Sequence, residues 1–162
     1  MGNIKIEIKW AILFTLMGLL WMVLEKLSGL HSTYIDYHLY LTNLFLIPAA
    51  WVIVLALKDK KNSFYNRQMS YKQGLISGIV LSIIIALLSP LSQWVISYVI
   101  SPEYFPNVIK RSVELGYYTT TEVAAANFNY LNYAKQGAIG MFFIGIITSA
   151  IAMIFIRTKN KE

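Results

Sequence analysis

Four long apolar stretches alternate with shorter polar segments along the chain. A membrane-spanning helix needs about 20 apolar residues, because hydrocarbon is about 30 Å thick and a helix rises about 1.5 Å per residue. Each stretch meets this length, and the longest has no charged side chain between Gly74 and Val99. The pattern predicts membrane spans at residues 8–27, 39–57, 74–100 and 137–156.

The segment 101–136 is too rich in charge to lie in hydrocarbon, and its amphipathic pattern predicts a partly helical outer segment. One helix is expected at 103–115, ended by Gly116. Thr119 and Glu122 match a capping box, which predicts a second helix through about Tyr133. The aromatic side chains here are expected to cap the bundle, and a surface for a protein partner is the alternative.

Composition supports a membrane protein. Hydrophobic residues make up 57% of the 162 residues and charged residues 14%, which is too apolar for an ordinary soluble domain. The predicted fold is therefore an all-α integral membrane four-helix bundle, a single domain over residues 1–162. Cysteine is absent, which excludes disulfides and thiolate metal sites.

Positive charge is distributed unevenly between the two sides that four spans define. One side holds ten of the fourteen Lys and Arg residues: Lys5, Lys9, Lys58, Lys60, Lys61, Arg67, Lys72, Arg157, Lys159 and Lys161. The positive-inside rule places this side, with both termini, in the cytoplasm. Because these charges flank apolar runs, the bilayer with its anionic lipids is the expected partner, and nucleic acid is not.

Polar residues recur at one depth in the outer half of the predicted bundle. The candidate polar layer consists of Glu25, Lys26, Asn43, Ser89, Ser92 and Gln93. One hypothesis is an outward-open site for a small polar ligand, a proton or a cation. The alternative is that the charged pair ends a helix at the headgroups while the amides bond between helices. Pro48 and Pro90 predict kinks in the second and third spans.

Small residues recur at four-residue spacing on the last two spans. The set comprises Gly74, Gly78, Ser82, Ala86, Gly145 and Ser149. This spacing lets two backbones approach closely. Packing of the third span on the fourth is the favoured interpretation, and a contact between two copies of the chain is the alternative.

Two histidines, His31 and His38, have Asp36 and Glu25 near them in sequence. Imidazole and carboxylate bind zinc and similar metals, but this spacing matches no established ligand signature. We expect no metal or other cofactor, with a histidine paired to Asp36 or solvated. The chain has no nucleophile elbow, zincin helix or phosphate loop, so no residue is expected to be catalytic and the chain is not expected to be an enzyme.

The chain resembles an uncharacterised bacterial family of four-helix membrane proteins, domain of unknown function 4199. The resemblance rests on residues 20–31 (LWMVLEKLSGLH), 40–43 (YLTN) with Pro48, 55–61 (LALKDKK), 69–78 (MSYKQGLISG), 89–94 (SPLSQW) and 101–107 (SPEYFPN). It implies an integral membrane protein, and we expect this one in the inner membrane of a bacterial cell. It implies no substrate, cofactor or catalytic residue.

Two functions remain open at this stage. The first is a non-enzymatic accessory or interaction subunit that packs with a second copy or with another membrane protein. The second is a small transporter or channel-like component. In that case Glu25 would pair with a proton or cation, and Asn43 and Gln93 would contact the ligand.

Overall fold

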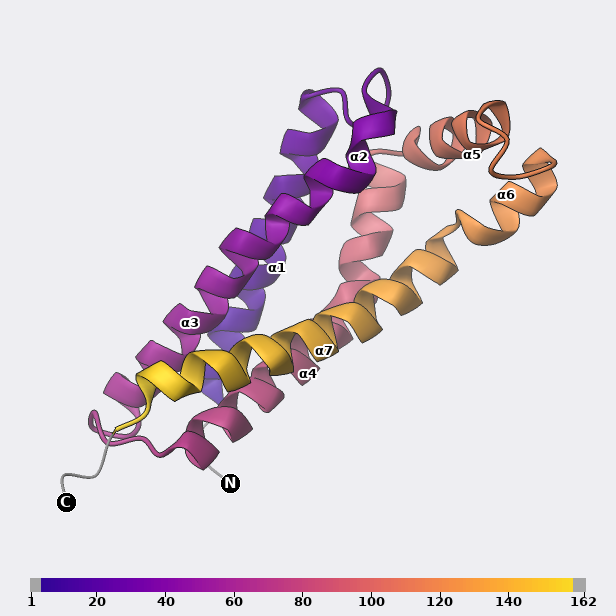
Figure 1. The fold of residues 1–162 in the computed structure, drawn as a ribbon. Coiled ribbons are helices and arrows are strands. Elements are labelled where there is room, and N and C mark those ends of the chain that lie inside the picture. The colour runs from indigo at the N-terminus through magenta and orange to yellow at the C-terminus, as the bar shows by residue number, and fades with distance from the viewer. Residues whose placement is uncertain (1–3, 159–162) are drawn as a thin grey trace.

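The computed structural model describes residues 4–158, and all regular secondary structure over them is helical (Figure 1). The predicted charges Lys159 and Lys161 lie outside this range. The helices in chain order are α1 (Lys5–Leu27), α2 (Ile35–Leu41), η1 (Thr42–Phe45), α3 (Leu46–Ser63), α4 (Tyr71–Val95), η2 (Ile96–Ile100), α5 (Tyr104–Glu114), α6 (Thr121–Asn127) and α7 (Tyr130–Ile156).

Within residues 4–158, four helical stretches are long and apolar enough to cross a membrane, which confirms the predicted all-α four-span architecture. They are Lys5–Leu27, Ile35–Ser63, Tyr71–Ile100 and Thr121–Ile156. The first three stretches and α7 each begin earlier than predicted, because polar residues extend the helix beyond the apolar run. At the start of α4, Ser70 accepts from the backbone of Gln73, whose side chain accepts from the Ser70 backbone.

Both prolines lie near changes in helix geometry. Pro48 is in the first turn of α3, directly after the 3₁₀ stretch η1, where a missing backbone donor is tolerated. Pro90 lies inside α4, and the π-helical turn η2 follows it. There the Ser101 backbone donates to the Ile96 carbonyl at 2.8 Å. The second and third spans therefore both change pitch in their outer halves.

The outer segment folds somewhat differently from the sequence prediction. Gly116 follows α5 with φ +75, as expected of a helix terminator. The cap of α6 is Thr120 rather than Thr119, and its hydroxyl accepts from the Val123 backbone. The second helix ends before Tyr133 because Asn129 caps the following helix, with its side chain accepting from the Asn132 backbone.

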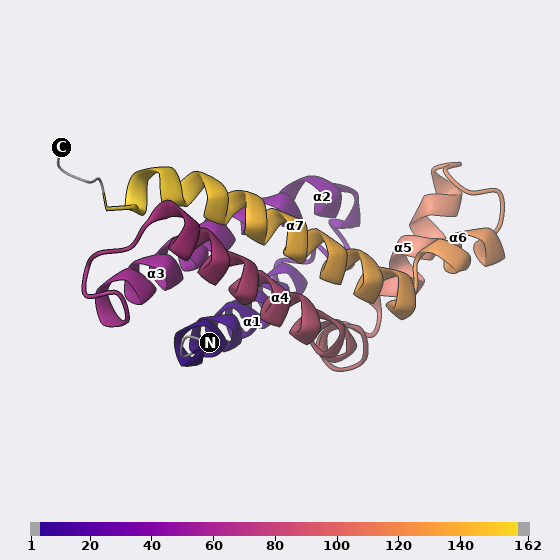
Figure 2. The same cartoon turned by 90° about the horizontal axis from the view of Figure 1, so that it is seen from below.

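Helices α4 and α7 pack closely in their inner halves and then diverge (Figures 1 and 2). An added Cβ at Gly78 would lie 2.3 Å from the Ser149 side chain, and one at Gly145 would lie 2.3 Å from Ser82 Oγ. The small-residue stripe thus lies at the contact between these helices within one chain. Helices α5 and α6 connect the separated outer ends, so the bundle is tight at one end and open at the other.

The tight end encloses a buried ion pair between α1 and α3. Lys60 Nζ lies 2.9 Å from Glu7 Oε1, and both side chains are about 5% exposed. Ser77 of α4 donates to the same oxygen at 2.6 Å. Although the sequence suggests a topology signal for Lys60, its side chain is buried and fixes three helices to one another.

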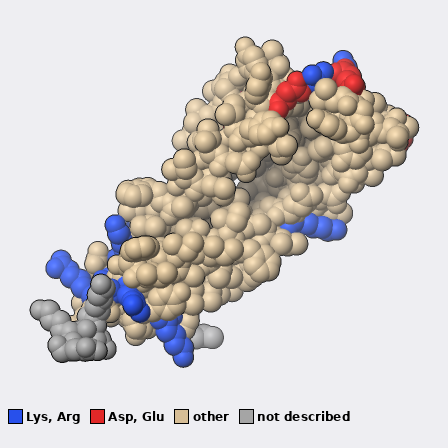
Figure 3. All heavy atoms as spheres, viewed as in Figure 1, with Lys and Arg blue, Asp and Glu red and all other residues tan. Residues whose placement is uncertain are grey.

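Most of the remaining positive charge lies at the end of the molecule that holds both termini, as Figure 3 shows on one face. Between this end and the outer half, the core is built from apolar side chains such as Ala11, Phe14, Ile53, Leu81 and Ile85. Large aliphatic side chains on all four spans face outward, which suits a lipid environment.

Candidate functional site

Glu25 is buried at the outer end of α1, where two histidines face it. Its Oε2 atom lies 3.3 Å from His31 Nε2 and 3.3 Å from His38 Nε2. The exposed fractions are 3% for Glu25, 1% for His31 and 15% for His38. We call Glu25, His31 and His38 the outer triad.

The turn after α1 brings these residues together. Gly29 has φ +82, a conformation that favours glycine, and its carbonyl accepts from the Tyr34 backbone. This turn folds His31 back onto Glu25 and starts α2, which supplies His38 from the other side. The expected pair of a histidine with Asp36 is wrong, because Asp36 pairs with Arg111 at 2.7 Å, and His31 is buried rather than solvated.

Further side chains hold the outer triad in place. Trp21 Nε1 donates to Glu25 Oε1 at 2.5 Å, and Ser101 Oγ lies 2.9 Å from His31 Nδ1. The Tyr104 hydroxyl lies 3.3 Å from His38 Nδ1. Burial raises the pKa of Tyr104, and the Tyr133 hydroxyl and the Glu25 charge act in the same direction, so Tyr104 stays a neutral hydrogen-bonding group.

A recess at the α2 and α5 end of the bundle, which we call the outer recess, leads to this cluster. It has a volume of about 420 Å³ and is bordered by α2, α5, the residues before α7 and the start of α7. His38, Tyr104 and Tyr133 form part of its wall, and Asp36 and Arg111 lie at its edge. The face in Figure 3 is hollowed in this region, beside the paired red and blue side chains. The outer recess therefore gives solutes a route to His38.

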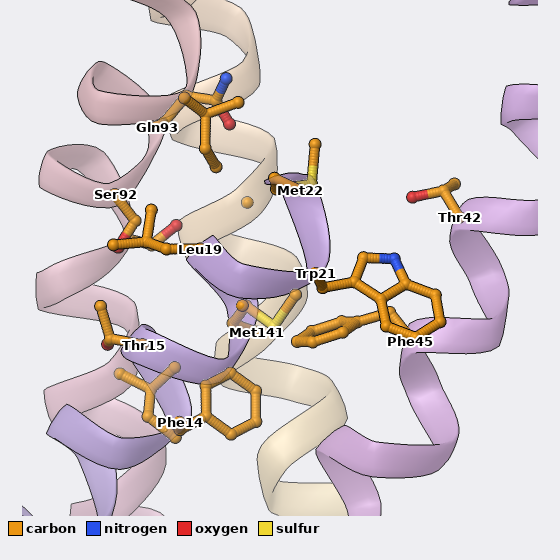
Figure 4. A pocket seen from close by; sticks show the side chains of 15 residues that line it. Phe14, Thr15, Leu19, Trp21, Met22, Thr42, Phe45, Ser92, Gln93 and Met141 are labelled. Atoms are coloured by element: carbon orange, nitrogen blue, oxygen red, sulfur yellow. The ribbon is translucent and has the colours of Figure 1, made fainter. Parts of the chain in front are cut away.

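A second cavity, the lateral cleft, lies deeper between α1, η1, α4 and α7 (Figure 4). Its volume is about 200 Å³. Apolar side chains dominate its wall, and Ser89, Ser92 and Gln93 add polar groups from α4. Trp21 belongs both to this wall and to the hydrogen bonds of Glu25.

The six residues of the predicted polar layer therefore occupy different places. Glu25 joins the outer triad, and Ser89, Ser92 and Gln93 line the lateral cleft. Lys26 Nζ donates to the Ile100 carbonyl at 2.5 Å and lies 3.4 Å from Glu103. Asn43 is exposed and donates to the Leu39 carbonyl of the preceding turn, so the structure places it outside both cavities.

A family model, described as a protein of unknown function (DUF4199), matches residues 9–158. The chain belongs to the DUF4199 family. The match covers all four membrane-spanning stretches almost completely. Neither a curated protein nor a solved structure matches the chain significantly. The four apolar helices found among its described residues make this DUF4199 protein a multi-pass membrane protein.

Several side chains of this DUF4199 protein that surround the outer triad were not predicted from the sequence. Tyr104 and Tyr133 were expected to cap the bundle or to form a partner surface, yet their hydroxyls lie 3.3 Å apart beside the outer triad. Ser101 directly follows the predicted third span, and its sequence neighbours give no sign of its contact with His31. One signal was available, because Trp21 precedes Glu25 by four residues and therefore shares its helix face.

Proposed function

We propose that this DUF4199 protein is a non-enzymatic accessory subunit of the membrane that holds an amphipathic ligand in its lateral cleft. The expected occupant is a molecule of the bilayer with one apolar chain and a polar end. The observation that carries this proposal is the lining of the cleft, with apolar side chains on most sides and three polar side chains along α4.

The shape of the cleft favours a narrow occupant. About 200 Å³ is below the usual range of about 300–1,000 Å³ for ligand pockets, so a transmembrane helix of a partner does not fit. The flexible side chains of Met22 and Met141 and the flat ring of Phe45 can contact a hydrocarbon chain (Figure 4). The Gln93 amide already donates to Ser97 at 3.0 Å, and its carbonyl oxygen can accept from a polar end group.

Gly18→Leu should remove lipid that stays bound during purification. Gly18 lines the cleft, and an added Cβ would lie 3.6 Å from the Phe45 ring, so a leucine extends into the space without a severe clash. The measurement is native mass spectrometry of protein purified in mild detergent. We expect one retained lipid on the natural chain and at least about tenfold less on the variant, since about 1.4 kcal/mol is sufficient for that change.

Gly140→Leu is the matched control, because an added Cβ at Gly140 meets no atom within 4 Å and the residue does not line the cleft. It should retain the lipid. Equal loss in both variants, or no retained lipid on the natural chain, would contradict the proposed ligand.

A transport role is the second candidate, and the outer recess that leads to His38 favours it. The buried clusters at Glu7 and Glu25 lie about 27 Å apart along α1. The apolar core separates them within one chain, so a transport path would require further subunits or a large rearrangement. We therefore favour the binding role.

We infer that the chain lies in a bacterial inner membrane with both termini in the cytoplasm, on the basis of the clustered positive charge. Reporter fusions after Lys61 and after Tyr118 test this orientation. An enzyme reporter active only in the cytoplasm should be active after Lys61, and one active only outside should be active after Tyr118. The reverse pattern would overturn the assignment of the outer side.

A further inference from the structure

We propose that the outer triad of Glu25, His31 and His38 binds a divalent transition metal ion of the zinc class. This proposal is independent of the ligand in the lateral cleft. The three side chains offer two imidazole nitrogens and one carboxylate oxygen, and these ligand atoms all lie within 4.8 Å of one another. Two imidazoles and a carboxylate form a donor set that zinc and its first-row neighbours accept.

The distances between donor atoms suit an ion of this size. Bonds of about 2.0 Å in a tetrahedral site place neighbouring donors about 3.3 Å apart. Both nitrogen-to-oxygen separations in the triad are 3.3 Å. The two imidazole nitrogens lie within 4.8 Å of one another, so the two rings would move closer together when an ion binds.

Hydrogen bonds prepare His31 to act as a ligand. The Ser101 hydroxyl donates to Glu103 Oε1, so it accepts from the Nδ1–H group of His31. The other ring nitrogen, Nε2, donates to Glu25 Oε2 at 3.3 Å, and a metal ion would take the place of this proton between the two atoms. Asn107 also fixes this residue by donating to the His31 carbonyl at 2.9 Å.

His38 has a nitrogen that the protein itself does not satisfy. Its Nε2 atom is buried and lacks a hydrogen-bond partner among the described residues, although it lies 3.3 Å from Glu25. Buried polar atoms are rarely left in this state. Its Nδ1 atom faces the Tyr104 hydroxyl, which can accept from it and donate onward to Tyr133. A cation between Glu25 and the two rings satisfies all three groups.

The fourth coordination position is available to water or another small ligand from the outer recess. His38 forms part of the wall of that recess, which provides the route for the ion. Three protein ligands with one open position distinguish this arrangement from a closed structural site. The ion would join the end of α1 to α2 and would place a positive charge beneath α5.

The test is metal binding by the full chain in detergent, purified without a histidine tag and stripped with chelator. Zn²⁺ should bind with a stoichiometry of one in isothermal titration calorimetry. Co²⁺ should give the visible absorption bands of a four-coordinate site, and excess Zn²⁺ should remove them. His38→Gln and His31→Gln should each abolish stoichiometric binding.

Two further variants distinguish this site from surface binding and from unfolding. Tyr104→Phe keeps all three ligands but removes the hydroxyl that orients His38, and it should weaken Zn²⁺ binding about 10–100-fold. Glu122→Gln removes an exposed carboxylate on α6, away from the triad, and should leave binding unchanged. Helical circular dichroism confirms that each variant is folded. Absence of Zn²⁺ and Co²⁺ binding by the folded natural chain, or full binding by His38→Gln, would overturn the proposal.

Discussion

Lys60→Met should destabilise the protein by about 3–5 kcal/mol, because it leaves the carboxylate of Glu7 buried without its positive partner. The two side chains are each about 5% exposed and lie 2.9 Å apart. Ser77 still donates to Glu7, but one neutral hydrogen bond does not replace the lost charge. The measurement is the free energy of unfolding in mixed micelles, from an SDS titration followed by circular dichroism.

Two controls separate the buried charge from general effects of the substitution. Lys58→Met changes an exposed lysine on the same helix and should shift the free energy of unfolding by less than about 0.5 kcal/mol. Adding Glu7→Gln to Lys60→Met should recover most of the stability, since no isolated charge then remains. A double variant as unstable as Lys60→Met alone would show that packing, rather than charge, explains the loss.

Gly78→Ala should lower the free energy of unfolding by about 1–3 kcal/mol, although alanine forms helix better than glycine. The new Cβ would lie 2.3 Å from both Cβ and Oγ of Ser149, so α4 and α7 must separate. The same SDS titration measures the effect. Gly140→Ala is the matched control on α7, where the added Cβ meets open space and stability should stay equal or rise.

Ser149→Gly should partly restore the stability of the Gly78→Ala variant, because it removes both atoms that the new Cβ meets. The double variant Gly78→Ala with Ser149→Gly should be more stable than Gly78→Ala alone, even though glycine weakens the interior of α7. If Gly78→Ala unfolds at the same SDS fraction as Gly140→Ala, the close approach of the two helices is not important for stability.

The pattern of apolar residues was sufficient to predict the four spans, because hydrocarbon requires long uninterrupted apolar helices whatever their neighbours are. The ends of helices were harder to predict because single side chains decide them. Asn129 is an example, since its side chain accepts from the Asn132 backbone and also donates to the Ala125 and Ala126 carbonyls. Asparagine is common in such turns, but the sequence also allowed a helix continuing to Tyr133.

The outer triad could be predicted only in part. Glu25, His31 and His38 were grouped from their proximity in sequence, but their pairing depends on the turn at Gly29. The residues that orient the rings, Ser101 and Tyr104, follow about 70 residues later and arrive through α4 and η2. Local patterns do not contain such contacts, because they depend on how complete helices pack.

The π-helical turn η2 has a geometric consequence for the metal ligands. Each residue of an α-helix turns the chain by about 100°, and a wide turn that contains one extra residue shifts the phase of everything after it by that amount. Ser101 is the first residue after this shift, and its hydroxyl meets His31 at 2.9 Å. The wide turn therefore sets the direction in which the chain leaves the third span, and it aligns the Ser101 hydroxyl with the imidazole of His31 in the turn after α1.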